Sequence, residues 1–94
     1  MSKTLYLSLK PKPFRDIISG KKKEEYRENK PHWIKRLFDK NGLRFDEIFF
    51  RNGYTRDRPF VRVELKGYEI DDVDGVIILK LGKILEVKID ENIM

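Results

Sequence analysis

Residues 60–68, FVRVELKGY, alternate apolar and polar side chains and indicate a sheet-forming chain. Period-two alternation is typical of a strand with one face buried and the other in water. A similar alternation occurs at residues 4–10, where every second side chain is leucine. It also occurs at residues 22–28, where both faces carry charged groups. We therefore expect strands at these three places and a further strand at residues 45–51.

Two short helices are expected between the strands. Residues 13–19 have apolar side chains at helical spacing, begin with a proline and are followed by Gly20. Glycine allows the left-handed backbone that commonly ends a helix. Residues 31–38 show the same spacing, also begin with a proline, and are followed by the stop signal Asn41-Gly42.

The last part of the chain predicts two more strands. Residues 76–81 form an apolar run and residues 84–89 alternate, so we expect a tight turn at residues 81–83. With no repeat or linker in the sequence, residues 1–94 are expected to form one α+β domain. Its predicted architecture is a small β-barrel of about five to six mostly antiparallel strands with two short helices.

The composition excludes several classes of protein. Of the 94 residues, 39% are hydrophobic and 12% aromatic, which is too many for an intrinsically disordered chain. The absence of cysteine excludes a disulfide framework and a cysteine nucleophile, and the single histidine excludes a multi-histidine metal site. We expect no metal and no cofactor. Because no apolar segment approaches the length of a membrane span, we expect a cytoplasmic protein with no membrane partner.

Positive charge is concentrated in the first half of the chain. Residues 1–44 carry 13 basic and 5 acidic side chains, whereas residues 45–94 carry 8 and 11. The densest basic run is Lys21-Lys22-Lys23, and aromatic side chains follow it closely. Basic groups beside aromatic rings suit single-stranded nucleic acid. The alternative is that these lysines form an ordinary hydrated surface that keeps a small domain in solution.

Three familiar motifs do not fit the sequence. Residues 69–75 are acidic, but aligning Gly75 with the glycine of a calcium-binding loop places apolar side chains at two ligand positions, so an acidic turn is expected. No glycine-rich phosphate loop is present, which excludes nucleotide hydrolysis of the P-loop type. His32 is a weak candidate for a general base, since no spacing joins it to a nucleophile.

The segment from Gly20 to Arg27 can bring opposite charges together. A helix end, a turn and a strand follow one another here, and Glu25 and Arg27 fall on the same side of the strand. A carboxylate held beside Lys22 and Arg27 would remain ionised at neutral pH. The alternative is a simple exposed ion pair between Glu25 and Arg27, worth up to about 1 kcal/mol.

Gly20, Lys22, Glu25 and Arg27 reproduce the pattern G-x-K-x-x-E-x-R, and in this the chain resembles the ASCH domain family. The order of elements agrees, and the resemblance covers essentially the whole chain, as in small stand-alone prokaryotic or phage-type members. It implies a PUA-like β-barrel with helices on one side and a cleft lined by the signature residues.

The resemblance also implies a range of functions. ASCH domains are proposed RNA-binding modules, and some small members are hydrolases. Certain members resemble amidohydrolases acting on N4-acetylcytidine, which use the signature lysine, a threonine where this chain has Glu25, and a downstream glutamate that Glu64 or Glu69 could supply here. Other members look like ribonucleases, a reaction in which Glu25 would serve as general base while Lys22 and Arg27 stabilise phosphate charge.

We predict a basic cleft that binds single-stranded RNA, a nucleoside or a nucleotide. Glu25 would accept a hydrogen bond from an amino or hydroxyl group, and basic side chains would contact phosphate or a base edge: Lys21, Lys22, Lys23 and Arg27. Three aromatic side chains are candidates for base stacking, with core packing as the alternative for the first two: Tyr26, Trp33 and Tyr54. One alternative function is a small metal-independent hydrolase with Lys22 and Glu25 as catalytic residues. The other is a protein-interaction adaptor using residues 69–74 and 52–59.

Overall fold

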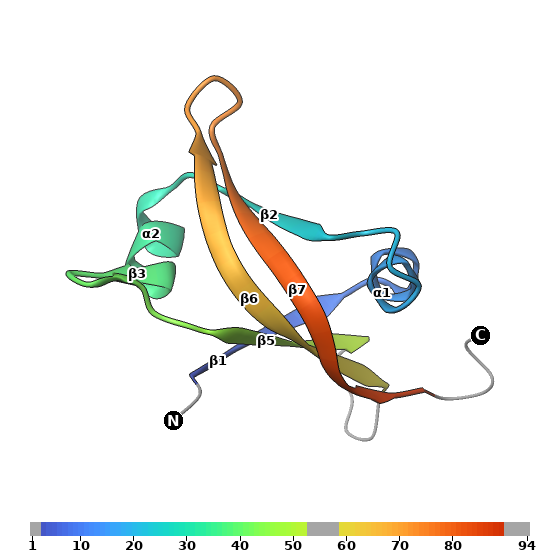
Figure 1. Ribbon diagram of the computed structural model, residues 1–94. Coiled ribbons are helices and arrows are strands. Elements are labelled where there is room, and N and C mark those ends of the chain that lie inside the picture. Colours follow the sequence, from blue (N-terminus) through green and yellow to red (C-terminus); the bar gives the residue numbers. More distant parts are fainter. Residues whose placement is uncertain (1–2, 53–58, 90–94) are drawn as a thin grey trace.

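A computed structural model describes residues 3–52 and 59–89, which form two helices and two sheets (Figure 1). The larger sheet has five strands in the order β1-β5-β6-β7-β2. Their bounds are Thr4–Leu9 for β1, Glu47–Asn52 for β5, Phe60–Asp71 for β6, Val76–Lys88 for β7 and Glu24–Glu28 for β2. The helices are α1, Pro11–Ile18, and α2, Pro31–Leu37, and the smaller sheet pairs β3, Phe38–Asp39, with β4, Gly42–Leu43.

The five-stranded sheet is mostly antiparallel, and only β1 and β5 run parallel to each other. The alternation in residues 60–68 has the predicted effect, because Val61, Val63 and Leu65 are buried while the side chains between them are not. The predicted α+β class with two helices is thus confirmed. A closed barrel is not confirmed, since β1 and β2 lie at opposite edges of the sheet and no pairing joins them in the described part of the chain.

The C-terminal part differs from the prediction. Residues 76–88 form one continuous strand, so the two strands expected at 76–81 and 84–89 are a single strand and the turn predicted between them at 81–83 is wrong. Gly82 lies within the strand, where it allows side chains of β6 to pack closely against the backbone of β7. A Cβ at this position would lie 2.8 Å from Cγ of Lys66 and would also collide with the Glu64 side chain. Irregular register between β6 and β7 accommodates this approach while the strands remain paired.

The acidic segment forms the predicted turn at the tip of the long β6–β7 hairpin, which projects from the body of the molecule (Figure 1). Oδ1 of Asp71 accepts hydrogen bonds from the backbone N–H groups of Val73 and Asp74. Gly75 completes the turn with φ 65°. The Asp71 carboxylate therefore provides an acceptor for backbone N–H groups of the turn, as is common for aspartate in such positions.

α1 connects β1 to β2, the two edge strands of the sheet, and α2 connects β2 to β3; both helices pack against the core side of the sheet. α1 begins at Pro11, two residues earlier than predicted, and buries Phe14 and Ile17. α2 spans nearly the predicted range and buries Leu37. Their apolar side chains join those of the strands in one cluster: Leu5, Leu7, Phe14, Ile17, Leu37, Ile48, Phe50, Val61, Val63, Leu65, Ile77, Leu79 and Leu81. Neither helix has the length and apolar character required to span a membrane.

Candidate functional site

The end of α1 positions the edge strand β2. Gly20 has φ 83°, and its N–H donates to the Ile17 carbonyl at 3.1 Å, while the Lys22 N–H donates to the Asp16 carbonyl at 3.0 Å. These bonds turn the chain so that β2 pairs antiparallel with β7. Glu25 then lies opposite the buried Leu79, so Glu25 and Arg27 face the core side while Glu24 and Tyr26 face the other side.

Glu25 lies between two cations. Its Oε1 atom is 3.4 Å from Nζ of Lys22 and 3.4 Å from Nη1 of Arg27, and it accepts a hydrogen bond of 3.0 Å from the Tyr26 N–H. The residue is 5% exposed. Its Oε2 atom is buried and has no hydrogen-bond partner among the described residues. One carboxylate thus shares one oxygen between two positive groups, and the three side chains carry a net charge of +1; we call them the Lys22–Glu25–Arg27 cluster.

Trp33, from α2, extends this cluster on the core side. The guanidinium carbon of Arg27 is 5.2 Å from the centroid of the Trp33 ring, and that of Arg36 is also 5.2 Å away. Nη1 of Arg27 further donates to the Tyr26 carbonyl at 2.6 Å. The Trp33 ring is half-buried against the core. Part of its surface is therefore used in core packing, the alternative to base stacking named above. Cation–π contacts of this kind are worth about 0.5–1 kcal/mol at exposed sites.

A cavity of about 880 Å³ lies beside the outer face of β2; we call it the β2 cavity. It is lined by three of the predicted lysines and one predicted aromatic: Lys21, Lys22, Lys23 and Tyr26. Lys22 joins the cavity to the cluster, because its ammonium contacts Glu25 and lies 5.8 Å from the centroid of the Tyr26 ring. Tyr26 is 47% exposed, so its ring is available to a ligand in this cavity.

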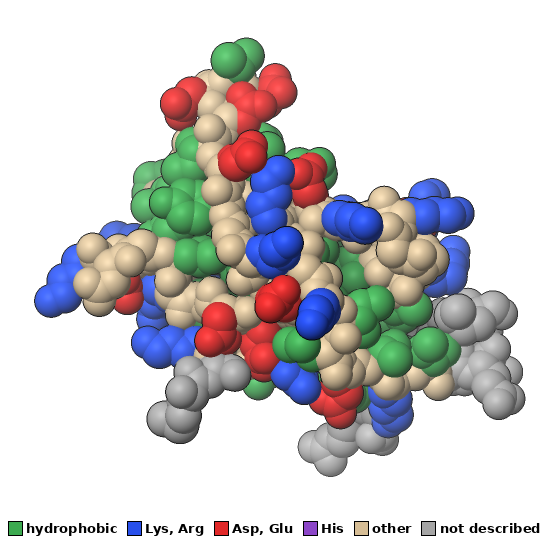
Figure 2. Space-filling view, in the orientation of Figure 1, with side chains coloured by type: hydrophobic (Ala, Val, Ile, Leu, Met, Phe, Trp, Pro, Cys, Tyr) green, Lys and Arg blue, Asp and Glu red, His purple; other side chains and the backbone are tan. Residues whose placement is uncertain are grey.

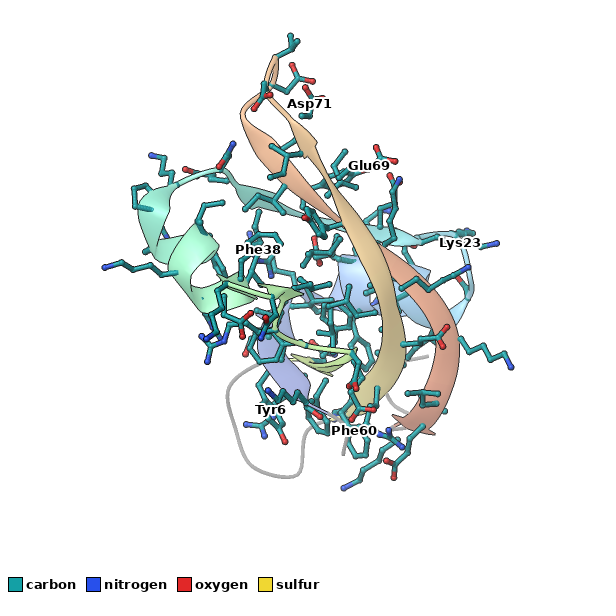
Figure 3. The ribbon with its side chains drawn as sticks, turned by 60° about the vertical axis from the view of Figure 1, so that its left-hand side comes forward. Tyr6, Lys23, Phe38, Phe60, Glu69 and Asp71 are labelled. Carbon is teal, nitrogen blue, oxygen red and sulfur yellow. The ribbon has the colours of Figure 1, made fainter. Side chains whose placement is uncertain are left out.

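Other strands complete the lining of the β2 cavity with residues that the sequence did not single out as a group. Lys80 from β7 forms ion pairs with Glu24 and with Glu69 from β6, the latter at 3.4 Å. The Tyr26 hydroxyl donates to Oε1 of Glu24 at 2.7 Å. Figure 2 shows basic side chains in front of the β6–β7 hairpin with carboxylates around them, and Figure 3 shows Glu69 and Lys23 on the same side of the molecule. Glu24 and Lys80 are 56 positions apart in the sequence. Strand pairing in the folded sheet brings them together, so the sequence alone does not reveal their contact.

Hydrogen bonding in this network alters three pKa values. Hydrogen bonds from Lys80 and then from Tyr26 lower the pKa of Glu24 below its usual 4.5. The Glu24 carboxylate raises the pKa of Lys80 above 10.5 and that of Tyr26 above 10.0. The network therefore holds the ionised Glu24, the charged Lys80 and the protonated Tyr26 throughout the neutral range.

The remaining candidates lie elsewhere. His32 is exposed at the start of α2, with its ring centroid 5.5 Å from that of Trp33. Glu64 lies beside Gly82 on β6, whereas Glu69 lines the β2 cavity. Tyr54 lies outside the described residues. Within residues 3–52 and 59–89, no group of three or more acidic or histidine side chains is arranged to hold a metal ion.

The arrangement offers two kinds of recognition side by side. The cations of the cluster can bind an anion or the acceptor edge of a base, and Glu25 can accept a hydrogen bond. The β2 cavity adds lysines and an exposed ring next to the same Lys22 side chain. Comparison of the chain with protein-family models and with curated proteins finds no match.

Proposed function

We propose that the protein binds single-stranded RNA or a nucleotide through the Lys22–Glu25–Arg27 cluster and the adjoining β2 cavity. The observation that supports this most strongly is that Lys22 and Arg27 share a single oxygen of Glu25 at 3.4 Å. At that distance neither cation is fully satisfied by the carboxylate, and their side chains remain 24% and 18% exposed. Two incompletely neutralised cations side by side form a suitable site for phosphate or for the acceptor edge of a base.

The β2 cavity supports a ligand of nucleotide size or larger. Its volume of about 880 Å³ lies within the range of small-molecule sites, which span roughly 300–1,000 Å³. Lys21 and Lys23 would contact the phosphate backbone, and the exposed Tyr26 ring would stack a base. Because Lys22 reaches both places, a ligand can contact the cluster and the cavity together.

Glu25 would contribute selectivity. Its Oε2 atom is buried without a donor among the residues that the structure describes, a state that costs about 1–3 kcal/mol. A ligand amino or hydroxyl group that approached this oxygen after a small side-chain movement would relieve that cost. An exocyclic amino group of a base or a ribose hydroxyl has the required donor.

The geometry supports recognition better than hydrolysis. A general base must lie within hydrogen-bond reach of the proton it removes. Oε1 of Glu25 already faces Lys22, Arg27 and the Tyr26 N–H, and Oε2 must leave its buried position before it meets any ligand group. A hydrogen bond requires only that contact, whereas hydrolysis also requires the scissile bond to be aligned with it. A small metal-independent ribonuclease remains the second candidate, because its reaction would use these same three side chains.

The proposal includes membership of the ASCH family and a PUA-like arrangement of the strands. It is supported by the way the four signature positions act together: Gly20 ends α1 with a positive φ, and the three charged side chains that follow form one cluster. The curved sheet with both helices on its core side is compatible with such an arrangement.

The test is fluorescence anisotropy of a labelled single-stranded RNA at low and moderate salt. We expect Lys22→Ala to weaken binding about tenfold, because the side chain serves both the cluster and the cavity. Lys40, exposed in the β3–β4 turn at the opposite side of the molecule (Figure 1), provides the matched control, and Lys40→Ala should change affinity less than twofold. Wild-type affinity should fall roughly tenfold to twentyfold between about 50 and 200 mM salt if three phosphates are contacted.

Three outcomes would contradict the proposal: no binding, binding that ignores salt, or equal effects of the two lysine variants. The RNA is recovered afterwards and checked for cleavage. If it is cut, and Glu25→Gln reduces turnover several hundredfold at unchanged affinity, the hydrolase is correct instead.

A further inference from the structure

A row of aromatic rings crosses the solvent-facing side of the sheet at β1, β5 and β6. The centroid of the Tyr6 ring is 5.3 Å from that of Phe49, and the Phe49 and Phe60 rings are stacked at 4.5 Å. Tyr6 and Phe60 lie at the same end of the molecule, away from Lys23 and Glu69 (Figure 3). We call these three side chains the aromatic ladder.

The aromatic ladder is separate from the hydrophobic core. Along β5, Ile48 and Phe50 are completely buried, whereas Phe49 between them faces the other side. Tyr6, on the edge strand β1, is 61% exposed. Aromatic pairs across strands stabilise a sheet, but that role does not require so open a ring at the end of the row. The exposed face of Tyr6 is therefore free to stack a planar group.

Positive charge accompanies the rings. The guanidinium carbon of Arg51 lies 5.8 Å from the centroid of the Phe49 ring, and Arg51 forms no ion pair with a carboxylate of the described residues. Arg62, by contrast, is neutralised by Glu47 at 2.8 Å and by Glu86 at 3.3 Å. A hollow of about 190 Å³ beside Arg51 is lined by Tyr6, Leu7, Ser8 and Phe49. An open ring, a cation and a hydroxyl thus border one small space.

Arg36 connects this surface to the proposed site. Its guanidinium lies over the Trp33 ring at 5.2 Å, the ring that Arg27 also covers, and its Nη2 atom donates to the Tyr6 carbonyl at 3.0 Å. Arg36 therefore lies between the Trp33 ring beside the cluster and the backbone of Tyr6 in the aromatic ladder. A chain of phosphates with bases between them matches this alternation of cations and rings.

We propose that a single-stranded RNA bound at the Lys22–Glu25–Arg27 cluster continues past Arg36 onto the aromatic ladder, where Tyr6 stacks a base and Arg51 contacts a phosphate. This inference rests on the proposed function, because it takes single-stranded RNA as the ligand, but it concerns the aromatic ladder rather than the cluster and the β2 cavity. It predicts that affinity rises with RNA length, because a longer strand has more nucleotides with which to contact both surfaces at once.

The test compares a labelled tetranucleotide with a dodecamer of uridine, by anisotropy. Tyr6→Leu keeps apolar area but removes the aromatic face, and we expect it to weaken binding of the dodecamer fivefold to tenfold and to affect the tetranucleotide less. Tyr6→Phe is the matched control and should remain within twofold of wild type. Arg51→Gln, an exposed change that leaves the rings in place, should weaken dodecamer binding about threefold and reduce its salt dependence. Circular dichroism establishes that each variant is folded.

The outcomes separate the two proposals. If Tyr6→Leu and Arg51→Gln bind the dodecamer like wild type while Lys22→Ala does not, the aromatic ladder is not a binding surface and the proposed function stands. Equal losses for Tyr6→Phe and Tyr6→Leu would overturn stacking. If Lys22→Ala has no effect while Tyr6→Leu weakens the dodecamer, the aromatic ladder binds RNA without the cluster, and both the proposed function and the continuous path past Arg36 are overturned. A wild-type protein that binds neither oligonucleotide overturns both.

Discussion

At the scale of single residues, Glu25 is the most informative side chain. A carboxylate that is nearly buried is stable in its ionised form only when positive charges or hydrogen-bond donors surround it. Lys22, Arg27 and the Tyr26 N–H provide this environment for Oε1. In return Glu25 orients both cations, which would otherwise extend into water. It is therefore an orienting residue for the cations as well as a candidate ligand contact.

Glu25→Gln should lower the free energy of unfolding by about 1–2 kcal/mol. The loss is smaller than for a fully buried pair, because Lys22 and Arg27 keep some contact with water. The measurement is urea denaturation followed by circular dichroism. Glu28→Gln is the matched control, since the Glu28 side chain on the same strand is 68% exposed and its ion-pair partner Lys30 is exposed as well. This substitution should cost less than about 0.5 kcal/mol. Equal effects of the two substitutions would show that the cluster has no special role in stability.

At the scale of elements, the β6–β7 hairpin is the framework on which the other strands assemble. β5 pairs with one side of it and β2 with the other. Its irregular register near Gly82 allows two long strands to stay paired while the sheet bends. Side chains from β6 lie over Gly82 at this place, so the glycine is required for space rather than for an unusual backbone angle.

Gly82→Ala should destabilise the protein by about 1 kcal/mol or somewhat more, because the Lys66 and Glu64 side chains must move to admit the methyl group. Gly67→Ala, on the neighbouring strand of the same hairpin, adds its methyl group where no atom lies within 4 Å and should be nearly neutral. Thermal and urea denaturation of both variants measures the difference. Similar stabilities for the two would disprove the close-approach role of Gly82.

The sequence predicted elements whose signal is local. The alternation of residues 60–68 indicated β6, and Gly20 with the preceding apolar spacing indicated the end of α1 and the turn into β2. The turn wrongly predicted at residues 81–83 shows the limit of such signals. A glycine can occur in a strand because a neighbouring side chain packs against its backbone, as well as in a turn. Residues 81–83 therefore resembled a hairpin connection although the strand continues through them.

The candidate site also contains one part that the sequence predicts and one part that it does not. Lys22, Glu25 and Arg27 lie on one turn and one strand, so their proximity followed from spacing. Lys80 and Glu69 join the β2 cavity only through strand register, which no local pattern encodes. The closure of the sheet also depends on long-range geometry, and the expected barrel was for that reason the least predictable feature of the fold.

At the scale of the whole molecule, charge is separated in space as well as in sequence. Lysines surround the β2 cavity, whereas carboxylates gather at the tip of the β6–β7 hairpin (Figure 2). A polyanion would be attracted to the first region and repelled from the second, so its direction of approach is restricted. The ion pairs of Lys80, in the lining of the β2 cavity, connect three strands.

This network gives stability a defined pH dependence. Folding lowers the pKa of Glu24, so its contribution is present above about pH 4.5 and is lost as the pH falls through the lower folded value. Folding raises the pKa of Lys80 and of Tyr26, so their contributions are complete below about pH 10 and are lost as the pH rises through the folded values. The protein should thus melt at lower temperature at both extremes.

Glu24→Gln should flatten both limbs of a plot of melting temperature against pH, because it removes the partner of Lys80 and Tyr26 together with the titrating carboxylate. Some dependence on the acid side should persist from Asp16, whose pKa a hydrogen bond from Lys12 lowers. Calorimetry across the pH range measures this, with Glu28→Gln as control. A profile unchanged by Glu24→Gln would contradict the role assigned to the network.

The pairing of β2 with β7 has a consequence for the order of folding. The β6–β7 hairpin closes through four turn residues, whereas the contact between Glu24 and Lys80 spans 56 positions. Contacts of high sequence separation form late because loop-closure entropy opposes them, and a strand held at one edge is also the first to detach in local unfolding. The cluster therefore exists only while β2 is docked. A bound ligand would slow hydrogen exchange of the β2 amides more than that of the hairpin, so recognition and the completion of folding are coupled at this edge of the sheet.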